Sequence, residues 1–240
     1  MLSLGLSDIY TYVKSRLDEL SNNDDALLVS NNQGVEDLEK EIDAVVEPAI
    51  RKIHLDAPNI LLKEGNSLAG SDVSAQDRAS VSEYYIARIN VPNDFLRLVT
   101  LKLNEWERPI QTLLGEDSAE YRKQQNPYLM GTPQRPVGFL THQGQKSNGV
   151  IELYSIINNN PVITFGWYVP NPVLNNNVVD IIETLKYPCL NQITAEVLRS
   201  LGRHQEAVVY DRLAVQPFYI DPDYARLNPP TSERFNSQTN

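Results

Sequence analysis

The stretch VVDIIETLKYPCLNQITAEVLRSLGRHQEAVVYDRLA, residues 178–214, decides the fold of this chain. Its apolar residues recur at helical spacing in three runs, which Pro188 and Gly202 separate. The runs are Val178, Ile181, Ile182 and Leu185; then Leu190, Ile193, Val197, Leu198 and Leu201; then Ala207, Tyr210 and Ala214. The pattern predicts closing helices over 178–214. Helical stripes of this kind are stable only when another element covers them.

Two N-terminal stretches predict the helices that provide this cover. Ser7 and Asp8 are candidate N-caps of a first amphipathic helix, which residues 21–25 end. A loop over 31–34 leads to a second amphipathic helix, in which Pro48 predicts a kink or a restart. The second stripe is Val35, Leu38, Ile42, Val45, Val46, Ala49, Ile50 and Ile53. Two helices joined by a loop pack antiparallel by default, so the two ends of the chain predict one antiparallel bundle.

The middle of the chain has the patterns of strands and turns. Residues 57–81 are rich in Gly, Ser, Asn and Asp, which predicts an exposed loop. Strand patterns cover 85–91, 137–140, 150–157 and 162–169, and Phe95 to Leu103 suits a strand or a helix. The last two strands are joined through Asn158-Asn159-Asn160-Pro161, which predicts a hairpin-like connection. Residues 116–136 are polar and predict a long excursion.

The sequence therefore predicts an α+β fold. N- and C-terminal helices form an antiparallel helical bundle, a small antiparallel β domain is inserted between them, and an extended C-terminal arm follows. The predicted segments are 1–56 for the first helices, 57–81 for a flexible loop, 82–177 for the β-rich domain, 178–214 for the closing helices and 215–240 for the arm.

Composition limits the classes of function. Apolar residues make up 41% of the 240 residues, so the chain can bury a core. The formal net charge of −10 argues against broad nucleic-acid binding, which needs a basic face. No apolar run has transmembrane length and no basic N-terminal leader precedes one, so we expect a soluble protein that is made in the cytoplasm.

No residue set predicts a reaction, a cofactor or a metal site. His54, His142 and His204 lie far apart without a Cys or Glu at ligand spacing. The acidic pairs Glu116-Asp117 and Asp221-Pro222-Asp223 suit acid–base chemistry, and equally solvated turns or caps. Neither a phosphate loop nor a nucleophile elbow is present. The one cysteine, Cys189, lies in an apolar stripe and is expected to be a buried thiol.

Aromatic residues in polar surroundings indicate contacts with other proteins. Trp106 stands in the polar stretch 103–109, where it suits an interface or a cover over the β domain. The segment 216–240 carries Phe218, Tyr219, Tyr224 and Phe235 among prolines. Disordered tails seldom contain so many aromatic residues, and proline lowers the entropic cost of docking. The segment therefore predicts a docking arm, with a disordered tail as the alternative.

The order of these elements, with Val91-Pro92-Asn93-Asp94-Phe95-Leu96-Arg97-Leu98 and the closing stretch from Tyr187-Pro188-Cys189-Leu190 to Tyr210, resembles the head–tail connector (portal adaptor) proteins of tailed bacteriophages. In that family a Pro-x-Asp-Phe-like turn follows the first strand and a Tyr-Pro lies where the closing helices begin. The excursion over 116–136 and the Asn-rich turns are similar to those of adaptor or ring proteins of crAss-like phages.

The resemblance implies a non-enzymatic virion subunit without a cofactor. Copies would form a ring, with twelve as the expected number, that extends the DNA channel between the portal and other tail or connector proteins. An acidic channel wall suits DNA that passes without being bound. The implied portal contacts are Phe218, Tyr219, Tyr224 and Arg226, and the expected contacts with neighbours are Trp106, Arg108 and Tyr128.

Two alternatives remain open. A different capsid-associated or tail-side scaffold with the same layout would assemble without affinity for a portal. A hydrolase would use carboxylates that the fold brings together in a deep pocket with perturbed ionisation.

Overall fold

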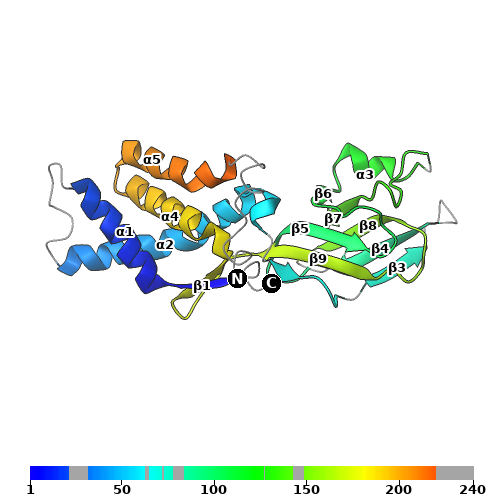
Figure 1. Ribbon diagram of the computed structural model, residues 1–240, viewed down its shortest axis with the longest axis horizontal. Helices are drawn as coiled ribbons and strands as arrows, with labels where there is room; N and C mark the ends of the chain where they lie inside the picture. Colours follow the sequence, from blue (N-terminus) through cyan, green and yellow to red (C-terminus); the bar gives the residue numbers. More distant parts are fainter. Residues whose placement is uncertain are drawn as a thin grey trace, which may run out of the picture. The chain divides into compact units, whose positions relative to one another are not determined.

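The chain combines helices and sheets, as the predicted α+β class requires (Figure 1). The computed structural model describes residues 1–21, 32–62, 65–71, 73–77, 84–126, 128–142 and 149–219. It divides into two compact units. The β unit is mainly Asn59–Val173, and the helical unit is mainly Leu4–Pro58 together with the chain from Leu185 onward.

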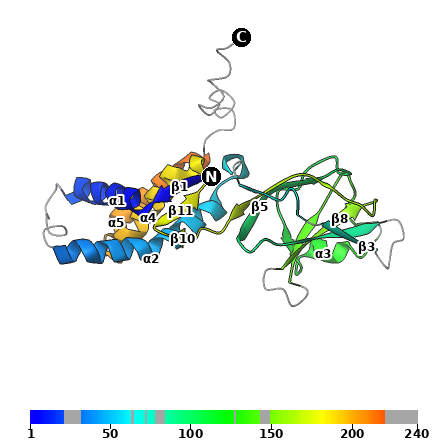
Figure 2. The ribbon, with the colours of Figure 1, turned by 90° about the horizontal axis from the view of Figure 1, so that it is seen from below.

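Four α-helices form the helical unit. They are α1 (Leu6–Ser21), α2 (Asn32–Asp56), α4 (Lys186–Ser200) and α5 (His204–Val215). Tyr10 of α1 donates a hydrogen bond to Asp43 of α2 at 2.6 Å, and Lys14 pairs with Glu39 at 2.6 Å. The contacts move forward along α1 as they move back along α2, so the two helices run antiparallel (Figure 2). Each of the four helices contributes buried apolar side chains to the core.

The first of the three runs, Val178 to Leu185, is not α-helical, so that prediction is wrong. Val178–Ile181 is strand β11, and it forms a tight hairpin with β10 (Leu174–Asn175). The two turn residues, Asn176 and Asn177, have φ of 50° and 63°. This left-handed pair is the two-residue turn that matches strand twist, and asparagine tolerates it. A 3-10 turn, η2 (Glu183–Leu185), follows, and the helix begins only at Lys186. Pro188 is in its first turn, where a missing N–H costs nothing.

Two helices also begin at other residues than the sequence predicts. α1 begins at Leu6, after strand β1 (Leu2–Gly5), so Ser7 and Asp8 lie in its first turn rather than before it. α2 begins at Asn32, within the predicted loop, and the helix continues through Pro48 without a restart. Gly202, with φ of 77°, ends α4 as predicted. The N–H of Arg203 donates to Leu198 O, and that of Gly202 to Arg199 O, which is the glycine-capped helix end.

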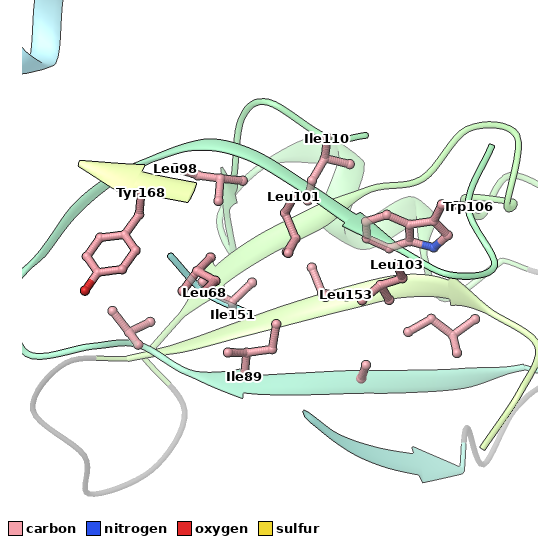
Figure 3. Packing of buried hydrophobic residues seen from close by; sticks show 13 residues of the cluster. Leu68, Ile89, Leu98, Leu101, Leu103, Trp106, Ile110, Ile151, Leu153 and Tyr168 are labelled. Carbon is pink, nitrogen blue, oxygen red and sulfur yellow. The ribbon is translucent and has the colours of Figure 1, made fainter. Parts of the chain in front are cut away.

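Two sheets enclose the core of the β unit. One sheet has the order β2 (Asn66–Ser67), β9 (Ile163–Pro170) and β5 (Phe95–Leu103). The other has the order β3 (Val73–Asp77), β4 (Tyr85–Asn90), β8 (Val150–Ile156), β7 (Gly138–Thr141) and β6 (Leu114–Gly115). All pairs are antiparallel except β6 with β7. Figure 3 shows Leu101 and Leu103 of the first sheet facing Ile89, Ile151 and Leu153 of the second.

Two predictions for the β unit are wrong. Residues 57–81 are not simply an exposed loop: they include β2, β3 and the 3-10 turn η1 (Asn59–Leu61), and Leu62 and Leu68 are fully buried. Strands β8 and β9 do not form a hairpin, because they lie in different sheets. The carboxylate of Glu105 accepts hydrogen bonds from the N–H groups of Ile157 and Asn158 at 2.8 and 3.1 Å, and this contact fixes the crossing between the sheets.

Candidate interaction surfaces

Helix α5 presents apolar side chains on two sides. Ala207, Tyr210 and Ala214 are buried against the helical unit. On the other side, Val208, Val209 and Leu213 are 45%, 54% and 41% exposed. Residues four apart in a helix lie on the same side, so Val209 and Leu213 are neighbours, whereas Val208 lies on the other side of Arg212. We call these three residues the α5 stripe. A surface helix normally carries polar residues at such positions, so the stripe is unusual in a subunit that stays alone.

Charged residues hold α5 against its neighbours and so fix the direction of the stripe. Arg199 of α4 pairs with Asp211 of α5, and Gln192 donates to Asp211 at 3.1 Å. Arg199 also pairs with Glu196 at 2.7 Å, and Lys52 of α2 lies 3.7 Å from Glu196. Burial alone would raise the pKa of Glu196, but the hydrogen bond and charge of Arg199 outweigh it, with smaller help from Gln192 and Lys52, and lower the pKa below its ordinary value.

A shallow hollow of about 300 Å³ lies at the C-terminal end of α5. Its almost wholly apolar wall is formed by Arg212, Leu213, Val215, Gln216 and Tyr219. Leu213 belongs to both the α5 stripe and the hollow, so the hollow adjoins the stripe. The volume is at the low end for ligand pockets and suits one or two protein side chains.

The residues predicted for portal contact begin at this hollow. Phe218 and Tyr219 lie in the 3-10 turn η3 (Gln216–Tyr219), which continues α5 directly, so the chain is still helical where the extended arm was predicted to begin. Phe218 is half-buried, whereas Tyr219 is 83% exposed. Tyr224 and Arg226 lie outside the described residues.

The excursion of the β unit carries a second exposed apolar surface. Tyr128 is 94% exposed and Leu129 is 59% exposed, and we call this pair the tip. The N–H of Leu129 donates to Asn126 O, and the N–H of Tyr128 donates to Asn126 Oδ1 at 2.9 Å. Gln124, which is buried, accepts a hydrogen bond from the N–H of Gly131 at 2.9 Å. The tip is thus presented by a loop with defined hydrogen bonds.

The prediction that Trp106 contacts a neighbour is wrong. Trp106 is 2% exposed, it packs in the core, and its indole N–H donates to Ser155 O at 3.2 Å (Figure 3). The exposed tryptophan is Trp167 of β9, which stacks on Phe165 with ring centroids 5.4 Å apart. Of the other residues predicted for neighbour contacts, Arg108 and Tyr128 are exposed, and their role stays a prediction.

The β unit also contains a buried polar cluster that no sequence pattern predicts. Glu152 of β8 is 1% exposed, and its Oε1 accepts hydrogen bonds from Arg88 of β4 at 2.9 and 2.7 Å. Its Oε2 accepts from the hydroxyls of Tyr121 and Tyr154, each at 3.2 Å. Burial, followed by the charge of Glu152, raises the pKa of Tyr154 above its ordinary value. The only sequence signal was one acidic residue inside an apolar strand.

The cluster ties helix α3 to the sheet. Tyr121 belongs to α3 (Ala119–Lys123), which Ser118 caps by accepting a hydrogen bond from the N–H of Tyr121 at 3.3 Å. Tyr121 also packs edge-on against Phe139 and Tyr154. Figure 1 shows α3 beside β6 and β7. Both oxygens of the Glu152 carboxylate accept hydrogen bonds from these partners, so the carboxylate connects α3 with β4 and β8.

The other residues considered for chemistry are not gathered into a site. Glu116 and Asp117 are exposed, as solvated residues of a turn are, and Asp221 and Asp223 lie outside the described residues. Cys189 is fully buried, as predicted, and burial raises the pKa of its thiol. Within the described ranges, no group of three or more His, Cys, Asp or Glu side chains is placed to hold a metal ion.

Neither a protein-family model nor a curated protein sequence matches the chain. In the part of the chain that the structure describes, no helix has the length and apolar character needed to cross a membrane.

Proposed function

We propose that this chain is a structural virion protein, a head–tail connector (portal adaptor) subunit that forms a ring beneath the portal and extends the DNA channel toward the tail. The observation that carries the proposal is the uncovered apolar surface made by the α5 stripe and the adjoining hollow. Burial of exposed valine and leucine side chains is the main driving force of subunit association. A protein that works by assembly needs such a surface, whereas a monomeric enzyme does not.

The layout of the chain supports the same proposal. Helices from both ends of the chain share one unit, and the β unit is inserted between them. In the connector interpretation the helices close a bundle, and the segment from Gln216 onward is an arm that docks on the portal. Tyr219, which is exposed beside the hollow, is where such an arm would leave the body.

Charge also fits a wall along which DNA passes. Helix α2 contains seven acidic residues and three basic ones, so it repels rather than binds a phosphate backbone. In this proposal the protein binds no cofactor and carries out no reaction, and the carboxylate hydrolase is the weaker alternative because Glu116 and Asp117 lie exposed and Glu152 is fully engaged.

The experiment is a mass measurement by light scattering on a sizing column, for the protein alone and with its cognate portal. Twelve copies of the 27.1 kDa chain would have a mass of about 325 kDa. Elution with the portal at a ring mass would support the connector. Assembly that ignores the portal would favour the other tail-side scaffold, and a monomer under both conditions would refute the proposal.

A further inference from the structure

We propose that the residues that follow α5, 220–227, fold back over their own helix in the free subunit and cover Val209, Leu213 and the hollow. The occupant of this apolar surface is then a segment of the same chain, Ile220-Asp221-Pro222-Asp223-Tyr224-Ala225-Arg226-Leu227, which lies outside the described residues. The consequence for assembly rests on the proposed function, because it concerns when the assembly surface is open.

The segment begins at the surface that it would cover. Helix α5 continues directly into η3, and Tyr219, the last described residue, lines the hollow together with Leu213. Ile220 is bonded to Tyr219 and therefore starts at the rim. Val209 lies ten residues before Tyr219, which is about 15 Å along a helix axis, whereas eight residues can span up to roughly 26 Å. The segment is thus long enough to reach both ends of the surface.

The apolar residues of the segment have the spacing of the residues that they would cover. Ile220, Tyr224 and Leu227 are four and three residues apart, the interval that gathers side chains on one side at helical spacing. Val209 and Leu213 are also four residues apart, and they are 54% and 41% exposed. Rows of side chains with the same period can interdigitate. The hollow of about 300 Å³ has room for one or two side chains of the segment.

The covalent connection favours the segment of the same chain over that of a second copy. A segment that is joined to its binding surface by a short connection has an effective concentration in the millimolar range. A second copy at about micromolar concentration would need a contact roughly a thousandfold tighter to compete. The segment contains two acidic residues, Asp221 and Asp223, and one basic residue, Arg226, so its charges nearly cancel. Apolar burial rather than charge would hold it in place.

This cover would make assembly conditional on the portal. In the proposed function, the exposed side of α5 contacts neighbouring subunits and the arm from Gln216 onward binds the portal. Residues 220–227 cannot occupy both positions, so binding of the arm to the portal would open the surface of α5 at the same time. Coupling of this kind needs one element with two exclusive positions, each favoured by a different partner. Free subunits would then stay apart until they meet the portal.

The test uses cysteine pairs in the full-length chain. Leu227→Cys is combined with Val209→Cys in one variant and with Val208→Cys in a matched control. Val208 and Val209 are the same residue type, are similarly exposed, lie at nearly the same distance from the end of α5, and point about 100° apart. The native Cys189 is buried, so it does not compete for oxidation. Unchanged unfolding midpoints of the reduced variants establish that both are folded.

Oxidation is followed over time on non-reducing gels at several protein concentrations, and mass spectrometry identifies the disulfide. We expect the 209–227 disulfide to form within monomers several-fold faster than the 208–227 disulfide, at a rate that does not depend on protein concentration. Equal rates would show that the segment reaches α5 without a preferred contact, and neither disulfide would show that it lies elsewhere. Either result overturns the proposal. Disulfide-linked dimers whose yield rises with concentration would also overturn it, because a second copy would then be the occupant.

The same variant separates this proposal from the proposed function. Protein locked by the 209–227 disulfide should not elute with the portal, and reduction should restore elution with it. Assembly of the locked protein would overturn the coupling between cover and portal. Rings that form without any 209–227 disulfide would refute the cover and leave the connector proposal standing. A fast 209–227 disulfide in a protein that ignores the portal even when reduced would support the cover and refute the connector.

Discussion

We expect Ser155→Gly to stabilise the β unit. Ser155 lies in β8 with φ of 74°, at an irregular point where Tyr85 and Ala87 of β4 pair with Ile156 and Leu153. A side chain makes this left-handed conformation costly by about 1–2 kcal/mol. The Ser155 hydroxyl is also buried without a hydrogen-bond partner among the described residues, which costs roughly 1–3 kcal/mol. Glycine removes both costs but gains unfolded-state entropy worth about 0.5–1 kcal/mol.

The net expected gain is roughly 1–4 kcal/mol in the free energy of unfolding. At about 2–4 °C per kcal/mol for a chain of this size, a gain of ~2 kcal/mol raises the unfolding midpoint by roughly 4–8 °C. Urea unfolding followed by tryptophan fluorescence is the assay, because Trp106 and Trp167 both lie in the β unit and report on it alone.

Gly131→Ala is the matched control. A Cβ at position 131 would collide with Ser155 Oγ and lie 2.7 Å from Val137 Cγ2, so this variant should lose about 1–3 kcal/mol. The double variant should recover part of the loss, since Ser155→Gly removes one of the two collisions. If Ser155→Gly leaves the urea midpoint unchanged or lowers it, the hydroxyl has a bonding role and the argument from strain is refuted.

Three further predictions concern the helical unit. Ile193→Asp should unfold it, because Ile193 is fully buried and a carboxylate there would have no partner, whereas Ile193→Val should cost only about 0.5–1.5 kcal/mol; circular dichroism distinguishes them. Deletion of 216–240 should leave both units folded but prevent assembly with the portal, and a collapsed melting transition would show that the segment belongs to the core. The pKa of Glu196 is lowered in the fold, so its contribution to stability is present above the ordinary carboxyl pKa of about 4.3 and is lost as the pH falls below it. In Glu196→Gln the free energy of unfolding should therefore fall less steeply as the pH is lowered below about 4.3. An unchanged pH dependence in this range would contradict the ion pairs of Glu196.

Local patterns predicted most of the individual elements. The amphipathic periods of α1, α4 and α5, the alternation in β4 and the stop at Gly202 each depend on residues close in the sequence, and each prediction is confirmed in type. The run from Val178 to Leu185 failed because its apolar spacing fits a helix and a strand equally. The two left-handed asparagines before it, which set the hairpin, were the deciding residues.

The tertiary arrangement was less accessible, because it depends on contacts between distant residues. The sheet crossing between β8 and β9 depends on Glu105, which lies some fifty residues before the turn that it binds. The exposure of residues at the candidate surfaces also depends on contacts between distant residues. Trp106 stands in a polar stretch and is buried, whereas Trp167 stands in an apolar strand and is 37% exposed, so local composition does not tell which tryptophan is exposed. In α5 the sequence does indicate an exposed apolar surface. Val208, Val209 and Leu213 are out of phase with the helix's buried residues, Ala207, Tyr210 and Ala214.

The division of the helical unit between the two ends of the chain sets the order in which the protein is made. α1 and α2 leave the ribosome first, but α4 and α5, which cover their apolar faces, begin only after about 130 further residues. At roughly 5–20 residues per second, this interval lasts about 6–26 s. The β unit is complete within that time, so it is the part that folds during synthesis. Nascent chains therefore display an uncovered helical hairpin for seconds, and chaperones that bind apolar segments should be found on translating ribosomes at this stage.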